Sequence, residues 1–264
     1  MISAFRKIFN ATFDLVITLL LWGYFFFGFL FLFSPFYLGA YFFSKNREYA
    51  FQALNHRFYK GFFLLARVFI PRLKVRVQDS VFAIRSSVIV CNHSSYLDPL
   101  FMISLFKRHK TIVKSTFFKV PVFGWLQRTA GYIPTATDPE FSSLMIKRLE
   151  GIKGYLAAGG NLFIFPEGTR SRNRKIGSFS KGAFHIAKSC RVPIRIISIK
   201  NSGRLFPPGH FLFAAHKRNT IEIQSIGSIE PGDGNDDFSI KILTRHVQSI
   251  FEKELYADLF SEDA

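Results

Sequence analysis

The sequence predicts an α/β protein: a mixed, mostly parallel sheet covered by helices, with an N-terminal membrane-embedded helical segment. Short apolar runs alternate with helical patterns after Pro71, and thirty uncharged residues, Leu15–Ser44, precede them. A length of 264 residues is enough for one large domain and an appendage. We therefore expect a membrane-anchoring helical segment over residues 1–70 and an α/β domain over residues 71–264.

The chain is strongly basic, and its charge is unevenly distributed. It has 35 Lys and Arg against 18 Asp and Glu, and 34 of its residues are Phe. This composition excludes collagen-like, disulfide-rich and disordered proteins, and it favours nucleic acid or an anionic membrane surface as partner. Twelve Lys or Arg and no acidic residue lie between Glu167 and Glu222, so that stretch is expected to face negative charge. The two cysteines, Cys91 and Cys190, fit a reducing compartment.

The uncharged N-terminal run is longer than one upright membrane span, which needs roughly 20 residues. Ser34-Pro35 is expected to kink or end the first helix. Two geometries stay open. One is a single tilted span, and the other is a hairpin that dips into one leaflet, with its second arm beginning at residues 36–43 and continuing beyond them.

Positive charge lies on both sides of this run, at Arg6 and Lys7 before it and at Lys45 and Arg47 after it. The positive-inside rule therefore leaves the orientation undecided, and the pattern is what a hairpin with both ends on the cytoplasmic face would show. The apolar core is too long for a signal peptide and has no small-residue cleavage site after it. Residues 61–70 are expected to form a short helix on the interface or against the domain.

Beyond Pro71, the periodicity predicts strands that alternate with helices. Asp138 suits a helix N-cap, and Gly159-Gly160 ends the helix that begins there. Such alternation indicates a parallel or mixed sheet with both faces covered. The strands are expected over residues 73–77, 88–91, 111–113, 162–165, 194–199 and 220–226, and the helices over residues 99–106, 138–158, 182–189 and 238–259.

A first polar group, Asn92–Asp98, comes directly after a buried apolar strand. His93 at the end of a strand can reach a cleft, and Asp98 at the start of the next helix can turn back towards it. The carboxylate would then fix one imidazole tautomer and leave the other nitrogen free to take a proton. The alternative is structural: His93 in a turn and Asp98 as a helix cap.

A second polar group, Phe165–Ser171, also comes after a strand. The loop contains Gly168, which lets backbone approach a ligand, and Arg170 offers a planar fork suited to phosphate oxygens. An ordinary turn with exposed charges is the alternative. In a parallel sheet, both groups would lie at the same edge, where open α/β sheets build their sites.

Together these residues resemble the glycerolipid acyltransferase family, whose best-known members acylate 1-acyl-glycerol-3-phosphate. The family's blocks occur in their usual order over about residues 88 to 200. The matching blocks are Asn92-His93 with Asp98, Lys114 with Pro121 and Gly124, the complete Phe165–Ser171, the run Phe179–Ala183, and Val192–Ile194.

The resemblance implies a membrane-bound O-acyltransferase of phospholipid biosynthesis. It would move a fatty acyl group from acyl-CoA or acyl-carrier protein to the free hydroxyl of 1-acyl-glycerol-3-phosphate, giving phosphatidic acid. His93 would be the base and Asp98 its orienting partner. The substrate-binding residues would be Lys114, Glu167, Gly168, Thr169 and Arg170.

The partners implied are membrane lipids, the acyl donor and a lysophospholipid acceptor, with no metal, no cofactor and no nucleic acid. The expected location is the membrane, with the active site on the cytoplasmic face.

One departure from the family's pattern keeps the acceptor open. After Gly131 the family usually has a hydrophobic pair and then a polar residue beside an Arg, whereas residues 132–137 here contain no Arg. Glycerol-3-phosphate, another lysophospholipid or a lyso-aminolipid are therefore alternative acceptors. A membrane-tethered nucleic-acid-binding protein is the non-enzyme alternative, but it leaves the two polar groups unexplained.

Overall fold

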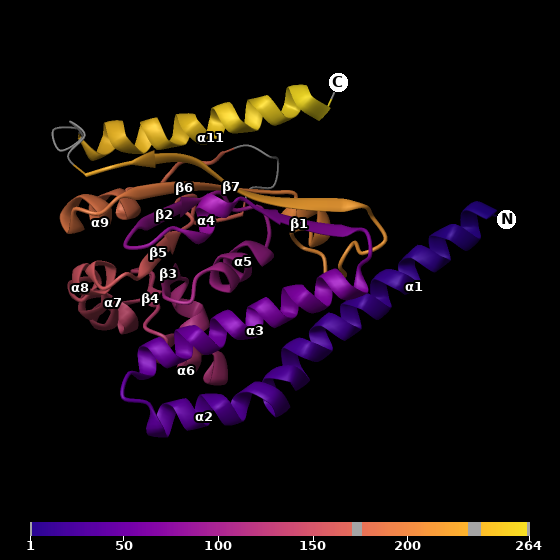
Figure 1. Ribbon diagram of the computed structural model, residues 1–264, viewed down its shortest axis with the longest axis horizontal. Helices are drawn as coiled ribbons and strands as arrows, with labels where there is room; N and C mark the ends of the chain where they lie inside the picture. Colours follow the sequence, from indigo (N-terminus) through magenta and orange to yellow (C-terminus); the bar gives the residue numbers. More distant parts are fainter. Residues whose placement is uncertain (1, 171–175, 232–238, 263–264) are drawn as a thin grey trace.

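A seven-stranded sheet forms the centre of the computed structural model, which describes residues 2–170, 176–231 and 239–262 (Figure 1). The strand order is β1-β7-β6-β2-β5-β3-β4. The strands are β1 (Leu73–Val77), β2 (Val88–Cys91), β3 (His109–Val113), β4 (Ile133–Pro134), β5 (Asn161–Ile164), β6 (Ile194–Lys200) and β7 (Asn219–Ile229). All six predicted strands are present, and β4 is an addition.

The sheet is mixed and mostly parallel, as the sequence predicts. The pairs β2–β5, β2–β6, β3–β5, β3–β4 and β1–β7 are parallel, and β6–β7 is antiparallel. The carboxyl ends of β2, β5, β3 and β6 therefore lie at one edge. The loops after these strands carry the predicted site residues.

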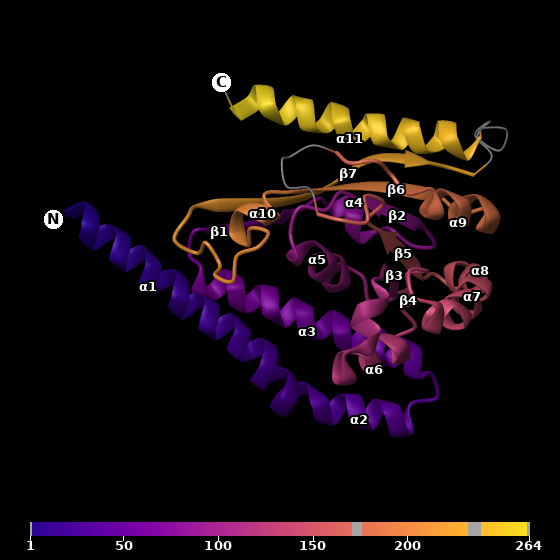
Figure 2. The ribbon, with the colours of Figure 1, turned by 180° about the vertical axis from the view of Figure 1, so that it is seen from behind.

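Helices cover both faces of the sheet (Figures 1 and 2). The side chains of β2 alternate between the two faces, with Ile89 and Cys91 in one core and Val88 and Val90 in the other. The first core lies against α3 (Arg47–Phe69) and α5 (Leu97–Leu105), and the second against α9 (Gly182–Cys190) and α11 (Ile240–Glu262). Both faces of a largely parallel sheet are buried, which explains its continuous apolar strands.

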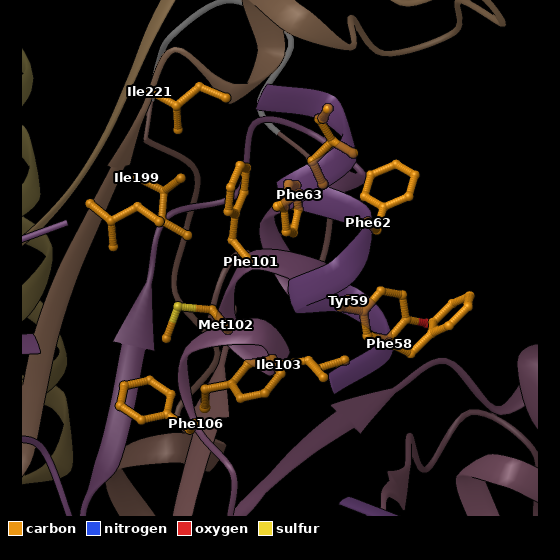
Figure 3. Close-up of a cluster of buried hydrophobic side chains, with 14 of the residues drawn as sticks. Phe58, Tyr59, Phe62, Phe63, Phe101, Met102, Ile103, Phe106, Ile199 and Ile221 are labelled. Carbon is orange, nitrogen blue, oxygen red and sulfur yellow. The ribbon is translucent and has the colours of Figure 1, made fainter. Parts of the chain in front are cut away.

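The core between α3, α5 and the sheet is rich in aromatic rings (Figure 3). Phe63 of α3 stacks on Phe101 of α5 with 3.7 Å between ring centroids. Ile199 of β6 and Ile221 of β7 complete this core from the sheet side. Residues 61–69, expected as a short helix of their own, are the second half of α3 and pack against the domain.

The N-terminal part is a helical hairpin. The first arm is one continuous helix made of α1 (Ile2–Gly23), a π-helical stretch η1 (Tyr24–Phe33) and α2 (Ser34–Phe43), and the second arm is α3. At Ser34-Pro35 the helix does not end: the axis bends between α1 and α2 (Figure 1), and the Ser34 N–H bonds the Phe29 carbonyl across a π turn. The chain reverses at residues 44–46, later than the predicted position.

The first arm is long and apolar enough to cross a membrane. The helical stretch Ser3–Phe43 has 41 residues, and only 22% of its most apolar part is buried within the protein. Large side chains along it stand exposed, among them Phe26, Phe31 and Phe43, which is 87% exposed. An apolar surface of this length needs an apolar surrounding.

Polar contacts attach α1 to the loop between β6 and β7. The Asp14 carboxylate accepts hydrogen bonds from the backbone N–H of His216 at 2.8 Å and from its Nδ1 at 2.6 Å. Thr18 Oγ1 accepts from the N–H of Phe213 at 2.9 Å. Asp14 is buried, so the hydrogen bonds from His216 compensate a carboxylate that would otherwise lie unpaired in an apolar helix.

A buried chain of hydrogen bonds joins the hairpin to the sheet. The Tyr37 hydroxyl donates to the Asn55 amide oxygen at 2.5 Å, and the Asn55 amide nitrogen donates to the Tyr132 hydroxyl at 3.0 Å. Tyr132 in turn lies 2.6 Å from Nε2 of His109, whose Nδ1 donates to the Phe106 carbonyl at 2.6 Å. Burial lowers the pKa of His109 to about 3, so the ring is neutral.

The remaining helices are short. The helix expected over residues 138–158 is divided into η3 (Pro139–Phe141), α7 (Ser142–Glu150) and α8 (Ile152–Ala157), with Asp138 as the predicted cap: its carboxylate accepts from the Glu140 N–H. Gly151 separates α7 from α8. Four helices and turns were not predicted: α4 (Asp79–Phe82), η2 (Ser115–Lys119), α6 (Pro121–Thr129) and α10 (Ser202–Leu205).

Candidate active site

The two polar groups meet at one edge of the sheet, as predicted. The β2 and β5 strands are adjacent and parallel, with Val90 opposite Ile164. Each group begins directly beyond these strand ends. The rings of His93 and Phe165 lie 4.5 Å apart between centroids, so the first group touches the second.

His93 and Asp98 form a hydrogen-bonded pair. Nδ1 of His93 lies 3.0 Å from Oδ2 of Asp98, and the same oxygen accepts the N–H groups of Ser94 and Ser95 at 2.7 Å each. Because a carboxylate only accepts, Nδ1 carries the proton and Nε2 is left free to accept one. Asp98 is fully buried and the His93 side chain is 15% exposed, so the ring alone reaches the surface.

Glu167 connects the two loops through its carboxylate. Oε1 accepts the N–H of His93 at 3.3 Å and Oε2 accepts the N–H of Gly177 at 3.0 Å. Burial raises the pKa of Glu167, and the two backbone hydrogen bonds oppose that shift. The Glu167 side chain thus fixes the backbone of His93, a role that the motif Phe165–Ser171 alone does not reveal.

Arg170 folds back onto the first polar group. Its guanidinium carbon lies 3.4 Å from the ring centroid of Tyr96. Nη1 of Arg170 is buried and has no hydrogen-bond partner among the described residues. A buried guanidinium N–H without a partner is costly, and an anion at this position would satisfy it. Ser171, the last residue of the motif, lies outside the described residues.

The other predicted substrate-binding residues lie at the same edge but make fewer contacts. Gly168 has φ +66°, a conformation that favours glycine, and both Gly168 and Thr169 are exposed. Lys114 is exposed after β3, and within the described residues no hydrogen bond or ion pair joins it to His93, Glu167 or Arg170. The structure therefore brings Glu167 and Arg170 to the His93–Asp98 pair and leaves Lys114 beside it.

The stretch after Gly131 carries hydroxyl groups where the resemblance leads one to expect an Arg. Thr135 Oγ1 accepts the N–H of Ser115 at 3.1 Å, and the Thr137 hydroxyl lies 3.0 Å from Thr135 and 3.1 Å from Ser115. These hydroxyls lie just after the ends of β3 and β4, next to Lys114 in the chain. They form a neutral polar rim on this side of the site.

Sequence reasoning assigned no role to several residues that hold the His93 loop. Asn92 bridges to β6, donating to the Ile199 carbonyl at 2.9 Å and accepting its N–H at 2.7 Å. The Ser95 hydroxyl donates to the Phe206 carbonyl at 2.9 Å, and the Ser94 hydroxyl lies 3.0 Å from that of Ser202. In the sequence, the only sign of these contacts is the run of polar residues between His93 and Asp98.

Similarity to known proteins covers the same blocks. Residues 72–200 match the family model described as Acyltransferase. These residues, just under half of the chain, are similar to that family. The fold of the chain extends the likeness: the crystal structure of the 1-acyl-sn-glycerophosphate acyltransferase PlsC from Thermotoga maritima superposes with a TM-score of 0.69, covering 96% of this chain and 97% of that one at 23% identity.

Curated members of the acyltransferase family resemble part of the chain. A chloroplastic 1-acyl-sn-glycerol-3-phosphate acyltransferase from Brassica napus is 39% identical over 124 residues, which are 46% of this chain and 35% of that protein. A 1-acyl-sn-glycerol-3-phosphate acyltransferase from Pseudomonas aeruginosa is 32% identical over 122 residues, 46% of each chain. The chain thus spans less than half the length of these relatives.

Proposed function

We propose that this protein is a membrane-bound O-acyltransferase that transfers a fatty acyl group from acyl-CoA or acyl-carrier protein to the free hydroxyl of 1-acyl-glycerol-3-phosphate, giving phosphatidic acid. The observation that carries the proposal is the His93–Asp98 pair beside Arg170, whose buried Nη1 has no hydrogen-bond partner among the residues that the structure describes. A base and an anion-binding group within one loop cluster suit an acceptor that has both a hydroxyl and a phosphate. The relatives from Brassica napus and Pseudomonas aeruginosa support this acceptor.

In this mechanism His93 acts as general base. Nε2 takes the proton of the acceptor hydroxyl while the oxygen attacks the thioester carbonyl. The C–O bond forms, the C–S bond breaks, and the proton passes from His93 to the leaving thiolate, which departs as a free thiol. Asp98 holds the ring through Nδ1 and stabilises the imidazolium that forms during the transfer.

The acceptor phosphate binds to Arg170. The Tyr96 ring covers one side of the guanidinium, so its N–H groups remain available in one plane for phosphate oxygens. Lys114 adds positive charge at the same edge, and the exposed Thr169 adds its backbone N–H, while the N–H of Gly168 donates to the Phe165 carbonyl at 3.1 Å and shapes the loop. Glu167 supports this arrangement by fixing the backbone of His93.

The N-terminal hairpin supports a reaction at a bilayer. Its exposed apolar face buries itself in lipid, and the basic surface of the domain attracts anionic headgroups and the acidic acyl donor. A site on the cytoplasmic side is part of this proposal, although positive charge on both sides of the uncharged run leaves the orientation undecided by the positive-inside rule.

Acyl transfer by membranes that contain the protein tests this proposal. Labelled acyl-CoA and acyl-carrier protein are offered with 1-acyl-glycerol-3-phosphate, glycerol-3-phosphate, a lyso-aminolipid and a phosphate-free monoacylglycerol. We expect phosphatidic acid as the main product. His93→Ala should lower turnover roughly 10²- to 10⁴-fold, the usual contribution of a general base, with the protein still folded and in the membrane.

Preserved turnover in His93→Ala with every acceptor would refute the mechanism. Efficient acylation of the phosphate-free acceptor would instead refute the acceptor assignment. The hydroxyl rim at Thr135 and Thr137 makes glycerol-3-phosphate and lyso-aminolipids the informative competitors in the panel.

A further inference from the structure

A cavity of about 580 Å³ lies at the opposite edge of the sheet from His93. Its wall includes the residues that precede β3 and β5, the end of β1, and one side of α3. The volume is that of a small-molecule site. The proposed acyl transfer makes no use of this cavity.

The rim of the cavity is cationic. Its basic lining residues are His56, Lys60, Arg67, Arg85, Lys107 and Arg108, and none of the lining residues is Asp or Glu. Some cations outside the cavity are paired with carboxylates: Glu48 binds both Lys110 and Arg148. The five Lys and Arg at the cavity form no ion pair with a carboxylate among the described residues.

The geometry keeps several of these charges in place. Arg85 donates to the carbonyls of Phe82 and Ile84 at 2.8 and 2.6 Å. Lys107 and Arg108 lie over the ring of Tyr49, 5.4 and 5.6 Å from its centroid, and Nε of Arg108 is buried without a partner in the described part of the chain.

The charges also act on their neighbour inside the cavity. Burial lowers the pKa of His56, the contact of its ring with the Ile103 carbonyl opposes that shift, and the positive charges of Lys60, Lys107 and Arg57 add to the lowering. An anion bound in the cavity would offset these positive charges.

The floor of the cavity is apolar. Phe63, Phe101 and Phe106, labelled in Figure 3, belong to the aromatic core and line it. Leu64 and Phe82, 60% and 47% exposed, extend this apolar surface to the rim. An apolar floor below a cationic rim suits a molecule with an alkyl chain at one end and an anion at the other.

We propose that this cavity binds a phosphate monoester carried on an alkyl chain, at a site separate from the His93–Asp98 pair. The chain lies on the phenylalanines and the phosphate faces Lys60, Arg67, Arg85 and Lys107. The absence of acidic lining residues disfavours a zwitterionic headgroup, because its ammonium group would have no carboxylate to pair with. The inference does not depend on the reaction at His93, because it rests on different residues.

Photo-crosslinking of the full chain in dodecyl maltoside micelles tests the site. The probe is dodecyl phosphate with a diazirine near the end of its chain, and labelled peptides are identified by mass spectrometry. We expect labelling of peptides that contain Phe63, Phe101 or Phe106. Excess dodecyl phosphate should suppress it, while dodecylphosphocholine and inorganic phosphate should compete at least roughly tenfold more weakly.

A pair of charge variants supplies the control. Lys60→Glu with Lys107→Glu should lower labelling roughly tenfold or more, because each basic residue near a lipid phosphate favours binding. Lys147→Glu with Lys153→Glu makes the same charge change at exposed positions outside the cavity and should leave labelling unchanged. All four lysines are exposed, so the variants should fold, which thermal unfolding verifies.

Labelling that is unaffected by Lys60→Glu with Lys107→Glu, or that falls elsewhere on the chain, would overturn the proposal. Equal competition by dodecylphosphocholine would overturn the role of the cationic rim. Equal competition by inorganic phosphate would overturn the alkyl-chain part and leave a free-phosphate site.

Discussion

The aromatic face of Tyr96 holds the Arg170 guanidinium at the edge of the candidate site, 3.4 Å from the ring centroid. Tyr96 itself is 51% exposed. The short distance to the centroid places the cation over the face of the ring. A cation held this way contributes about 0.5–2 kcal/mol, depending on how far it is desolvated.

Tyr96→Ala should raise the KM for the phosphate-bearing acceptor roughly two- to thirtyfold and change kcat little. Tyr96→Phe keeps the ring and should behave as the wild type.

Arg170→Ala should lower kcat/KM for the phosphate-bearing acceptor roughly tenfold to a hundredfold, because a charge-assisted hydrogen bond is lost. Steady-state kinetics with a phosphate-bearing and a phosphate-free acceptor measure this. Equal losses with both acceptors would remove Arg170 from the phosphate site.

For single residues of the candidate site, the sequence predicted side-chain contacts within a motif but missed contacts between loops. The five-residue step from His93 to Asp98 brings the two side chains together, as expected. The hydrogen bonds of Glu167 to His93 and Gly177 join positions that are distant along the chain, and no local pattern marks Gly177 as a partner. Tyr96 was overlooked because its role is seen only once Arg170 is placed.

Among the helices and strands, the first turn of α6 leaves no room for a side chain at Gly124. A Cβ on Gly124 would lie 2.1 Å from the carbonyl oxygen of Phe118, a backbone atom that cannot move aside freely. The N–H of Gly124 bonds the Val120 carbonyl at 2.6 Å, which fixes the turn. Phe118 is fully buried, so any shift reaches the core.

Gly124→Ala should therefore lower the free energy of unfolding by about 1–3 kcal/mol, as overpacking does. Gly154→Ala is the matched control: it lies in α8 with nothing within 4 Å of its Cβ, and it should be neutral or stabilising by up to about 1 kcal/mol. Thermal unfolding of both variants in detergent measures the difference. A Gly124→Ala protein as stable as Gly154→Ala would contradict the close approach.

The helices and strands also show where the pattern of apolar residues is enough to predict an element. Strands such as Val88–Cys91 are predictable because they are short, apolar and buried on both faces. The reversal of the hairpin was misplaced because a π turn carries the helix past Pro35, and such a turn leaves no sequence pattern that marks it. The two-residue strand β4 is too short for any periodicity to reveal.

Over the whole molecule, the buried hydrogen-bond chain from Tyr37 to His109 makes stability dependent on pH. The folded state keeps His109 neutral, with its pKa lowered to about 3, whereas in the unfolded chain the ring gains a proton below about pH 6.5. The stabilising contribution of the neutral ring is complete above that value and is lost as the pH falls towards 3.

We expect His109 alone to account for roughly 3 kcal/mol of lost stability between pH 7 and pH 4. His109→Gln should unfold with a shallower pH dependence across this window, measured by chemical unfolding in detergent. If that variant does not fold, the His109 imidazole resonance in the wild type provides the test. A titration midpoint near pH 6.5 in the folded protein would contradict the prediction.

The contact between Asp14 and His216 sets an order of events during synthesis. The two residues are 202 positions apart, and a ribosome adds roughly 5–20 residues per second, so the carboxylate waits roughly 10–40 s for its partner. During this time an ionised group on an apolar helix is costly to place in hydrocarbon and is retained at the water boundary. The helix that carries Asp14 makes its contacts with His216 only after the β6–β7 loop has left the ribosome, so it docks later than the elements that lie between them in the chain.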